Sequence, residues 1–523
     1  MIQQQSTSPR GEPCSLPPVL TITLNPAATK PVTPTSHDPD GRRLPIKLDA
    51  TTNGEFAPIP LEPVHHHARQ LAATAVGDNA KRRNVSRRSF VVSACGAAST
   101  LLAINSAYAA AGRSAGYYQL AAESALDPEI ANAALQGSEF IFDVQGHFVN
   151  PQGAWLTQLP LGARPLSDFP KTDCALADTP GERSYLQCLG EDEFIKDIFL
   201  DSDTDMMVLS FVPSYRDAEP LTIEEAAVTA GIVERMEGSH RLLVHGRVNP
   251  NQEGDLQGMD ELAARWKVSA WKTYTQWGPD GKGFFLNDDT GIEFIEKARK
   301  LGVRNICVHK GIPFGPESYE HSLCDDIGVV ARKYPDVNFL IYHSGFVPGQ
   351  SEGPYNPARN EGIDSLIKTV IENDVAGIGN VYAELGSTWR YLMRDPGSAA
   401  HSLGKLFKYL GEDNVLWGTD SIWYGSPQDQ IQAFRTFLIS EALREAHGYP
   451  EITPELRAKV FGLNAMKPYH VSIEEMKQHA GRDRIAVERL TYQESPDPHF
   501  RTHGPKTRRE FLNLLAWKGG QRV

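Results

Sequence analysis

Eight short apolar runs, each followed by a segment with helical spacing, constrain the fold more than any other feature of this sequence. The runs have the length and the β-branched content of buried strands. The segments between them, such as 290–301 and 363–372, carry apolar residues three and four positions apart, as amphipathic helices do. Strands that are apolar on both faces and are joined through helices run parallel. The predicted strands are 140–144, 206–212, 242–248, 268–274, 304–308, 338–342, 380–384 and 415–417.

A closed (β/α)8 TIM barrel is the simplest arrangement of eight such α/β units, and an open doubly wound sheet is the alternative. No glycine-rich fingerprint follows the first strand, so a dinucleotide-binding half is not expected. The first βα connection, 148–205, is much longer than the others and would form a lid or a wall of the active-site pocket. The predicted parts are a disordered region at 1–80, an export-signal segment at 81–112, a linker at 113–138, the barrel at 139–470 and a C-terminal extension at 471–523.

The charge and cysteine content exclude several other classes of protein. A formal net charge of −13 disfavours a nucleic-acid binder and a protein that rests on anionic lipid, because both need a basic surface. The six cysteines show no CxxC spacing, which disfavours zinc-ribbon and thioredoxin-like folds. In an exported protein, Cys174 and Cys188 could form a disulfide; two unpaired thiols are the alternative.

The N-terminal region predicts an exported protein. Residues 1–80 are rich in Pro, Ser, Thr and Ala and bury too little apolar surface to offset the entropy of ordering. Residues 86–90 (Ser-Arg-Arg-Ser-Phe) then resemble the twin-arginine export motif, and Ala107-Tyr108-Ala109 fits a signal-peptidase site. We therefore expect the twin-arginine export machinery as a partner and a periplasmic or secreted location. An internal amphipathic helix is the alternative, and the apolar stretch is too short for stable membrane insertion.

Residues that bind metals or move protons close most of the predicted strands. Gln145 and His147 end the first strand on one side, because they are two positions apart. The carboxyl ends of the strands of a barrel meet at one face, so we expect these side chains to converge. The other strand-end residues that can bind a metal or move a proton are Lys272 in strand four, His309 after strand five, His343 after strand six, Glu384 after strand seven and Asp420 after strand eight.

In order and spacing, these strand ends resemble the amidohydrolase superfamily, and especially its amidohydrolase-related branch, which includes aminocarboxymuconate-semialdehyde decarboxylase. The resemblance covers about residues 139–470 and includes Asn464-Ala465, which is similar to the family's Asn-Ala after the barrel. The matching stretches are Asp143-Val144-Gln145-Gly146-His147, Val308-His309-Lys310, Tyr342-His343-Ser344-Gly345 and Trp417-Gly418-Thr419-Asp420.

The resemblance implies that His147, His309 and Asp420 bind one divalent metal ion and that His343 faces the substrate. Imidazole and carboxylate ligands favour Zn²⁺, with Mn²⁺ or Mg²⁺ as alternatives. The metal would lower the pKa of a bound water, Asp420 would accept its proton, and His343 would stabilise charge on the substrate oxygen. Gln145 stands where the family usually has histidine; its amide oxygen is a weaker and harder ligand, so a lower metal affinity or loss of the metal stays open.

Three more residues are candidates for substrate binding. Lys272 matches the position at which some members of the superfamily carry a carbamylated lysine; pairing with a substrate carboxylate or with Glu384 is the alternative. Arg247 could clamp an anionic substrate, and a structural ion pair is its alternative role. Trp423 could line an aromatic pocket or pack beneath a loop.

Three functions follow from this pattern. The preferred one is an exported metal-dependent hydrolase of an amide, ester or lactone, because the superfamily is mostly hydrolytic. The second is a metal-dependent, non-oxidative decarboxylase (a lyase) of an aromatic or unsaturated carboxylate, which Arg247 or Arg390 at the pocket would favour. The third is a metal-free barrel that binds a ligand or partner. Fold alone does not choose between the first two, both of which act on a small molecule, and a homodimer stays open.

Overall fold

The computed structural model describes residues 43–159, 162–163, 185–237, 240–314, 318–479 and 483–519. They belong to one compact unit, Ser36–Val523. Its paired strands are all parallel and follow one another in chain order in two sheets, β1–β3 and β4–β9. The strands are β1 (Phe142–Gly146), β2 (Met206–Leu209), β3 (Leu242–Val244), β4 (Gly246–Arg247), β5 (Trp271–Tyr274), β6 (Asn305–His309), β7 (Asn338–Tyr342), β8 (Val381–Glu384) and β9 (Val415–Leu416).

Backbone hydrogen bonds join the two sheets into a closed barrel. His245 separates β3 from β4 within one extended segment, but its N–H donates to Leu209 O of β2 at 3.0 Å. At the other seam, Val144 N of β1 donates to Trp417 O at 3.0 Å, and Asp420 N donates to Gln145 O at 3.0 Å. The predicted (β/α)8 TIM barrel is therefore the observed fold, with β3 and β4 together forming its third strand.

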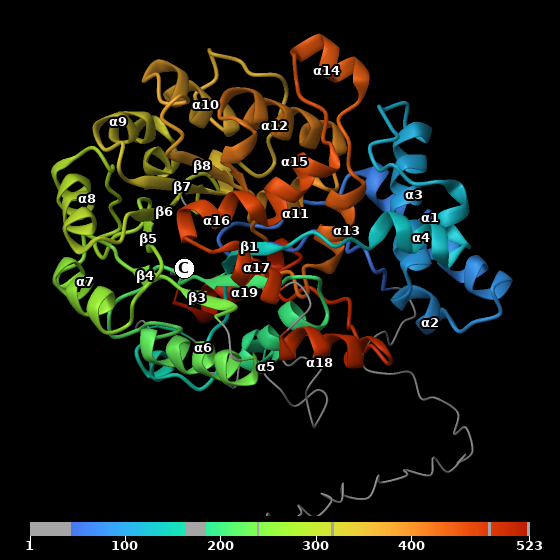
Figure 1. The fold of residues 1–523 in the computed structure, drawn as a ribbon, viewed down its shortest axis with the longest axis horizontal. Helices are drawn as coiled ribbons and strands as arrows, with labels where there is room; N and C mark the ends of the chain where they lie inside the picture. The colour runs from blue at the N-terminus through green and yellow to red at the C-terminus, as the bar shows by residue number, and fades with distance from the viewer. Residues whose placement is uncertain are drawn as a thin grey trace, which may run out of the picture. The chain divides into compact units, whose positions relative to one another are not determined.

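The helices surround the strands, and their positions agree with the apolar spacing (Figure 1). The helices expected at 290–301 and 363–372 are present as α8 and α10. The N-terminal and barrel helices are α1 (Pro63–Arg82), α2 (Arg87–Val92), α3 (Ala94–Ala110), α4 (Pro128–Leu135), α5 (Glu191–Ile195), α6 (Ile223–Glu237), α7 (Asp255–Ala264), α8 (Asp289–Leu301), α9 (Asp325–Lys333), α10 (Ile363–Glu372), α11 (Thr388–Leu392), α12 (Pro396–Tyr409), α13 (Gln428–Thr436), α14 (Glu441–His447), α15 (Pro454–Ala458) and α16 (Asn464–Tyr469). The C-terminal extension adds α17 (Ile473–His479), α18 (Arg484–Gln493) and α19 (Arg508–Trp517).

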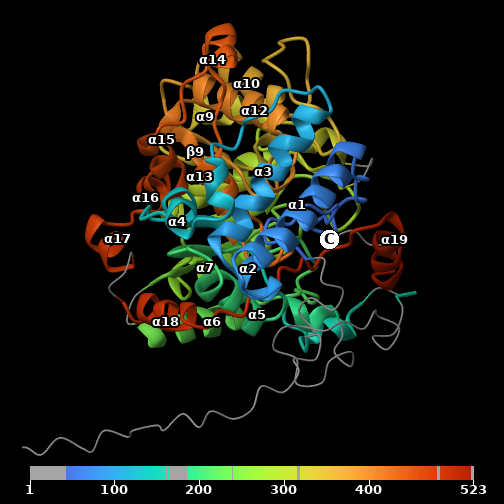
Figure 2. The ribbon, with the colours of Figure 1, turned by 90° about the vertical axis from the view of Figure 1, so that its right-hand side faces the viewer.

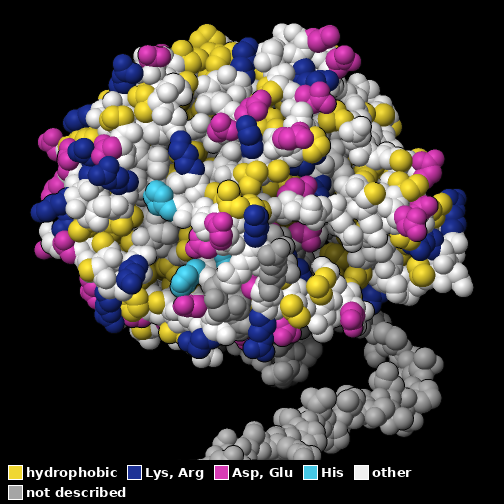
Figure 3. All heavy atoms as spheres, in the orientation of Figure 1, with side chains coloured by type: hydrophobic (Ala, Val, Ile, Leu, Met, Phe, Trp, Pro, Cys, Tyr) yellow, Lys and Arg dark blue, Asp and Glu magenta, His cyan; other side chains and the backbone are white. Residues whose placement is uncertain are grey.

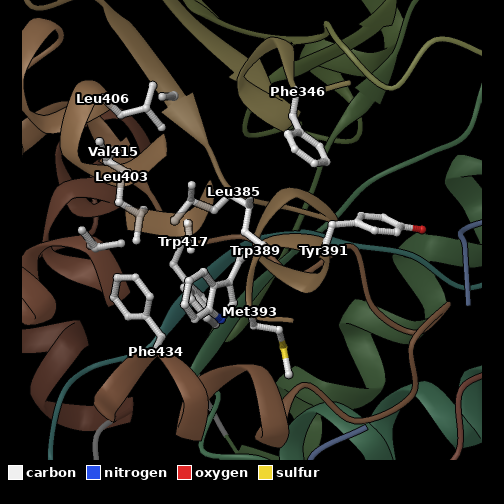
Figure 4. Close-up of a cluster of buried hydrophobic side chains, with 14 of the residues drawn as sticks. Phe346, Leu385, Trp389, Tyr391, Met393, Leu403, Leu406, Val415, Trp417 and Phe434 are labelled. Carbon is white, nitrogen blue, oxygen red and sulfur yellow. The ribbon is translucent and has the colours of Figure 1, made fainter. Parts of the chain in front are cut away.

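An aromatic cluster fixes α11 and α13 against the last strand of the barrel. Figure 4 shows Trp389 of α11 and Trp417, which follows β9, close to Phe434 of α13. The ring of Phe434 lies 5.1 Å from that of Trp389 and 5.3 Å from that of Trp417. All three side chains are fully buried, and large aromatic side chains dominate the burial energy of such a core. The cluster thus holds the polar residues that follow β8 and β9 in fixed positions.

The N-terminal region is folded over the part that the structure describes. Helices α1 and α3 pack side by side, and α3 also contacts α4 and α13 (Figure 2). Disorder was predicted through residue 80, and this expectation does not hold for residues 43–80, because Ala68, Ala72 and Val76 of α1 are buried in the main core. Residues 1–42 lie outside the described residues.

The predicted export signal also takes part in this packing. Leu101 and Ile104 of α3 are buried in the main core, and Arg88 forms an ion pair with Asp497 of the C-terminal extension. Within the described ranges, no helix has both the length and the apolar character that a membrane crossing needs. On the face seen in Figure 3, acidic and basic side chains are interspersed.

Cys188 is disulfide-bonded. Of the two alternatives for the first connection, a disulfide or two unpaired thiols, this agrees with the disulfide. Cys174, its expected partner, lies outside the described residues. Among the cysteines that the structure describes, Cys95, Cys307 and Cys324 are free thiols.

Residues 43–62 form an extended strap that Asp49 attaches to the barrel. Its carboxylate accepts hydrogen bonds from Arg390 Nη2 and from Thr502 Oγ1, both at 2.7 Å. Burial alone would raise the pKa of Asp49, but the charges of Arg390 and Lys506 and the hydroxyl donors lower it to about 2. The ionised carboxylate therefore stabilises the folded state.

Replacing Asp49 with Asn should lower the free energy of unfolding by about 1–2 kcal/mol near pH 6, as expected for a shift of this size at a partly exposed group. The pKa is lower in the folded state, so this contribution is complete above the unfolded value of 3.8 and is lost as the pH falls toward 2. Urea unfolding of both proteins at pH 6 and pH 3 tests this: the difference should shrink at pH 3. Asp78→Asn, at an exposed pair with Lys81, is the control and should change stability by less than about 0.5 kcal/mol at either pH.

Candidate active site at the barrel mouth

The strand ends bring a set of buried polar side chains together at one mouth of the barrel. Here "mouth cluster" means Glu55, Gln145, His147, His309, His343 and Asp420, all of which are buried. The clearest grouping within it is Glu55, His309 and His343, whose ligand atoms lie within 4.8 Å of one another. The expected convergence of His309 and His343 is therefore observed.

His309 and His343 both present a nitrogen lone pair to the cluster. His343 Nδ1 lies 2.6 Å from Gly386 O, a carbonyl that can only accept, so Nδ1 carries the proton and Nε2 is left as an acceptor. In the same way His309 Nε2 contacts Ile312 O at 3.4 Å, which leaves Nδ1 toward Glu55. Burial lowers the pKa of His343 to about 4 and that of His309 well below its usual value, so both rings are neutral near pH 7.

This tautomer changes the expected role of His343. A neutral ring that donates through Nδ1 has no N–H on Nε2 with which to stabilise a developing negative charge. It can bind a metal ion or accept a proton there instead.

Asp420 lies beside this group and is held by four donors. His147 Nε2 is 3.2 Å and Gln145 Nε2 3.1 Å from its Oδ1. Asn53 Nδ2, at 3.2 Å, and the Ser387 hydroxyl donate to its Oδ2. Burial would raise the pKa of Asp420, but the hydrogen bond and charge of His147, the charge of His343 and the Ser387 hydroxyl lower it. Asp420 is therefore the ionised carboxylate of the site.

Gln145 donates to Asp420 through its amide nitrogen, and its Oε1 is buried without a hydrogen-bond partner among the described residues. His147 Nδ1 is likewise buried without a hydrogen-bond partner among the described residues. The predicted ligands thus divide into two adjoining parts, since His147, Gln145 and Asp420 contact one another whereas His309 pairs with His343 and Glu55.

Glu55 and Asn53 are the functional candidates that the sequence analysis missed. Both come from the strap, in a polar stretch without periodicity, so no pattern in the sequence marks them. Asn53 Nδ2 donates to Glu55 Oε2 at 2.6 Å as well as to Asp420, and Glu55 Oε1 lies 3.9 Å from His309 Nδ1. Burial and the nearby charge of Asp420 raise the pKa of Glu55 to about 8. An acidic group with a raised pKa beside one with a lowered pKa is typical of acid–base sites.

Lys272 and Glu384 are buried and do not line the mouth cavity. The Nζ of Lys272 has no hydrogen-bond partner within the described part of the chain and sits 3.8 Å from the ring centre of Tyr342. Burial lowers its pKa to about 8 and raises that of Glu384 to about 8. Glu384 accepts from the backbone N–H groups of His343 and Gly386, so it orients the turns that carry the site.

The other two predicted substrate-binding residues have different outcomes. Arg247 forms ion pairs with Glu219 and Asp255 and does not line the mouth cavity, which matches the structural alternative. Trp423 lines the cavity and stacks on His147 with ring centres 5.8 Å apart. Arg390, the other candidate clamp, pairs with Asp49 of the strap and is likewise absent from the cavity wall.

The mouth cavity has a volume of about 70 Å³ and mostly apolar walls. The long first connection contributes Val149, Trp155 and Leu189, as expected of a pocket wall. The C-terminal extension contributes Leu514, Trp517 and Lys518 at the end of α19. A cavity of this size is smaller than one that holds a benzene ring, about 150 Å³, so a larger substrate requires one of these walls to move.

The donor set of the mouth cluster fits a divalent cation. Two imidazole lone pairs and a carboxylate lie within 4.8 Å, and a second carboxylate, Asp420, adjoins them. Nδ1 of His309 is buried without a hydrogen-bond partner among the residues described. Such a mixture of nitrogen and oxygen donors suits Zn²⁺ and similar borderline ions.

The comparison with protein families is consistent with a parallel barrel that carries candidate metal ligands at its mouth. Residues 244–471 match the family model Amidohydro_2, described as amidohydrolase, which supports the amidohydrolase superfamily. The matched region contains His309, His343 and Asp420; Glu55, Gln145 and His147 precede it. No curated protein matches the chain.

Similar solved structures include two decarboxylases and one hydrolase. A 5-carboxyvanillate decarboxylase from Novosphingobium aromaticivorans, with bound manganese, has 14% identity and a TM-score of 0.42 over 64% of this chain and 97% of that chain. A 2,6-dihydroxybenzoate decarboxylase from Rhizobium has 14% identity and a TM-score of 0.38 over 64% and 99%. A probable 2-pyrone-4,6-dicarboxylic acid hydrolase from Acinetobacter baumannii has 12% identity and a TM-score of 0.37 over 63% and 99%. Likenesses this distant do not decide the reaction.

Zinc titration of variants should show which residues hold the cation. His309→Gln should weaken Zn²⁺ binding at one site by at least about 100-fold, because His309 belongs both to the structural group and to the set predicted from the sequence. Glu55→Gln distinguishes the structural group from the ligands predicted from the sequence. A comparable loss of affinity is expected if Glu55 is a ligand. Unchanged affinity would favour His147, His309 and Asp420 as the ligands. His321→Gln, a half-buried histidine outside the cluster, is the matched control.

Proposed function

We propose that this protein is a metal-dependent hydrolase of the amidohydrolase superfamily that cleaves an amide, ester or lactone. The observation that carries the proposal is the buried convergence of Glu55, His309 and His343 beside the ionised Asp420 at the barrel mouth. The family match to residues 244–471 supports the same class.

In this proposal Glu55, His309 and His343 hold one divalent ion, with Zn²⁺ as the first candidate and Mn²⁺ or Mg²⁺ as alternatives. When bound, such an ion supplies a water of lowered pKa and polarises a carbonyl oxygen. His343 is then a ligand rather than the acid or base that the sequence suggested, and Gln145 lies outside the ligand set.

Asp420 is the proton acceptor of the site. It is ionised, it adjoins His343, and its Oδ1 is fixed by His147 and Gln145. Its Oδ2 accepts from Asn53 of the strap and from the Ser387 hydroxyl, and in this proposal water or substrate takes the place of Asn53 on that oxygen. A carboxylate positioned in this way typically contributes about 10²–10⁴-fold as a general base.

The cavity walls indicate the kind of substrate. Trp155, Trp423 and Trp517 offer apolar and aromatic surface, whereas Lys518 is the cation among the described lining residues. Burial lowers the pKa of Lys518 to about 8, so it is largely protonated at pH 7. A small substrate with an apolar body and one anionic group fits these walls.

Non-oxidative decarboxylation of an aromatic or unsaturated carboxylate is the second candidate. It needs cations to bind the carboxylate, and Arg247 and Arg390 are both occupied by carboxylates elsewhere. Lys518, a cation of the cavity wall, is the observation that favours this reaction. Lys272 is buried without a hydrogen-bond partner in the described structure, but it does not line the cavity.

Isotope labelling separates the two reactions on whichever substrate a panel of lactones, esters, amides and aryl carboxylates identifies. Hydrolysis in H₂¹⁸O should place one ¹⁸O atom in the product carboxylate, whereas decarboxylation should release CO₂ and, in D₂O, place one deuterium on the product carbon. Asp420→Asn should lower kcat/KM by at least about 100-fold in the hydrolytic case, since it removes the base. Mass spectrometry of the products is decisive, and CO₂ release with no ¹⁸O uptake would overturn the hydrolase proposal.

We also propose that the active enzyme retains its N-terminal region. Export to the periplasm or beyond the cell by the twin-arginine route stays a prediction from the motif at 86–90. Cleavage after Ala109 would remove the strap with Asn53 and Glu55 and the core helices α1 and α3. A cleaved chain would therefore lack part of the site as proposed here.

Intact-mass analysis of the protein from its own cells, with separate export fractions, tests retention of this region. We expect a species that still contains residues 43–112, and we expect a chain beginning at residue 113 to lose activity and stability because α3 no longer fills the core. A fully active mature protein that begins near residue 110 would refute both the retention of the strap and the role of Glu55.

A further inference from the structure

A second buried cluster of possible metal ligands lies between the first βα connection and the C-terminal extension. Glu193 of α5 and Asp197 of the helical turn that follows face His499 and His503 of the extension. Ligand atoms of all four side chains lie within 4.8 Å of one another, and each side chain is at most 4% exposed. None of the four lines the mouth cavity, so this cluster is separate from the proposed active site.

Local structure aims these residues at a common point. Glu193 and Asp197 are four positions apart in helical backbone and therefore share one face. His499 and His503 lie in a segment without regular structure, which is held in place by Trp423 O accepting from the backbone N–H groups of His503 and Gly504. Such an irregular segment needs specific contacts to order two buried imidazoles.

The head groups approach closely but do not satisfy one another. His499 Nε2 lies 3.1 Å from Asp197 Oδ1, and His503 Nε2 lies 3.6 Å from Asp197 Oδ2. Among the residues that the structure describes, both oxygens of Asp197 and both of these nitrogens lack a partner with hydrogen-bond alignment. Leaving buried polar atoms of this kind without aligned hydrogen bonds is costly. The four head groups instead converge on one another, as ligands around a cation do.

Hydrogen bonding identifies which groups can donate a lone pair. The backbone N–H of Arg501 donates to His499 Nδ1 at 2.9 Å, so the proton of a neutral His499 ring is on Nε2. His499 can then donate to a bound carboxylate or water, but it does not offer a lone pair to the cluster. The remaining donors of lone pairs are Glu193, Asp197 and His503.

We propose that Glu193, Asp197 and His503 bind a second divalent cation, of the borderline class that includes Zn²⁺ and Mn²⁺, and that His499 positions Asp197. One imidazole and two carboxylates suit these ions, with water or a second carboxylate oxygen completing the coordination. The cation would fasten the C-terminal extension to α5, and its binding free energy would add to the stability of the folded state. The same extension carries α19, whose Leu514, Trp517 and Lys518 close the mouth cavity.

Zinc stoichiometry of the full-length protein tests the proposal, with Zn²⁺ alone as the probe. Asp197→Asn and His503→Gln should each remove one tightly bound Zn²⁺ ion, with at least a 100-fold loss of affinity, whereas His499→Gln should weaken that site only about 10–100-fold because it acts through Asp197. His479→Gln is the matched control: His479 is also a buried histidine of the extension paired with an aspartate, Asp483, but it belongs to neither cluster. It should keep the wild-type stoichiometry.

A variant at the barrel mouth distinguishes this site from the proposed active site. His309→Gln should lose the mouth ion and keep the second one, and His309→Gln combined with His503→Gln should lose both. If the wild-type protein binds no Zn²⁺ that Asp197→Asn and His503→Gln remove, the second site does not exist, whatever happens at the mouth.

Hydrogen exchange supplies a readout that does not depend on the Asp197 and His503 variants folding. In the His309→Gln protein, a chelator should speed amide exchange in segments 191–200 and 495–505, because it removes the cation that holds them together. Exchange in α10 should not change. Equal exchange with and without chelator in both segments would overturn the proposal.

Discussion

The seam between the first and last strands is the contact on which the rest of the structure depends. The buried carboxylate of Asp143 accepts hydrogen bonds from Gln145 N at 3.0 Å and from the backbone N–H and the hydroxyl of Thr419. It thereby ties β1 to the residues after β9 and closes the barrel. The same hydrogen bonds of Asp143 place Asp420 against Gln145 and His147. The residue that fixes the barrel's closure therefore also fixes the geometry of the site.

Burial sets the chemistry of that site. Because these side chains are buried, His309 and His343 remain neutral and Glu55 has a raised pKa, whereas Asp420, with four donors, is stabilised as an anion. Segments from both ends of the chain cover the mouth. The strap covers one side with Asn53 and Glu55, and α19 covers the other with Trp517 and Lys518.

Much of the barrel could be predicted from the sequence, because burial on both faces gives parallel strands continuous apolar runs. Each of the eight predicted strands overlaps an observed one, and His309 and His343, at the ends of two of them, meet as expected. The exact ligand arrangement could not be read in this way. The tautomer of His343 depends on Gly386 O, which lies 43 positions away in the chain.

The N-terminal region shows where prediction from composition fails. Pro and Ser content predicted disorder through residue 80, yet Asp49 and Glu55 are held by partners far along the chain, Arg390 and His309. Composition reports what a segment can bury by itself, not what it can bury on a preformed barrel. The motif around Arg87 and the apolar α3 show the same ambiguity, because an export signal and a buried helix need similar apolar residues.

The two ends of the chain are also bound to each other, and this limits how a substrate can enter. Thr502 of the extension donates to Asp49 of the strap at 2.7 Å, and Thr51 donates to Thr502. Thr52 N donates to Pro505 O at 3.0 Å, a few residues before α19 begins. Between these contacts and the mouth, α19 is the part of the cover with the fewest buried residues, since Phe511 and Trp517 are its buried side chains. Opening at α19 would widen the cavity while leaving Asn53 and Glu55 in place, whereas movement of the strap would dismantle the site. The strap therefore supplies residues of the site itself, whereas α19 supplies part of the cavity wall.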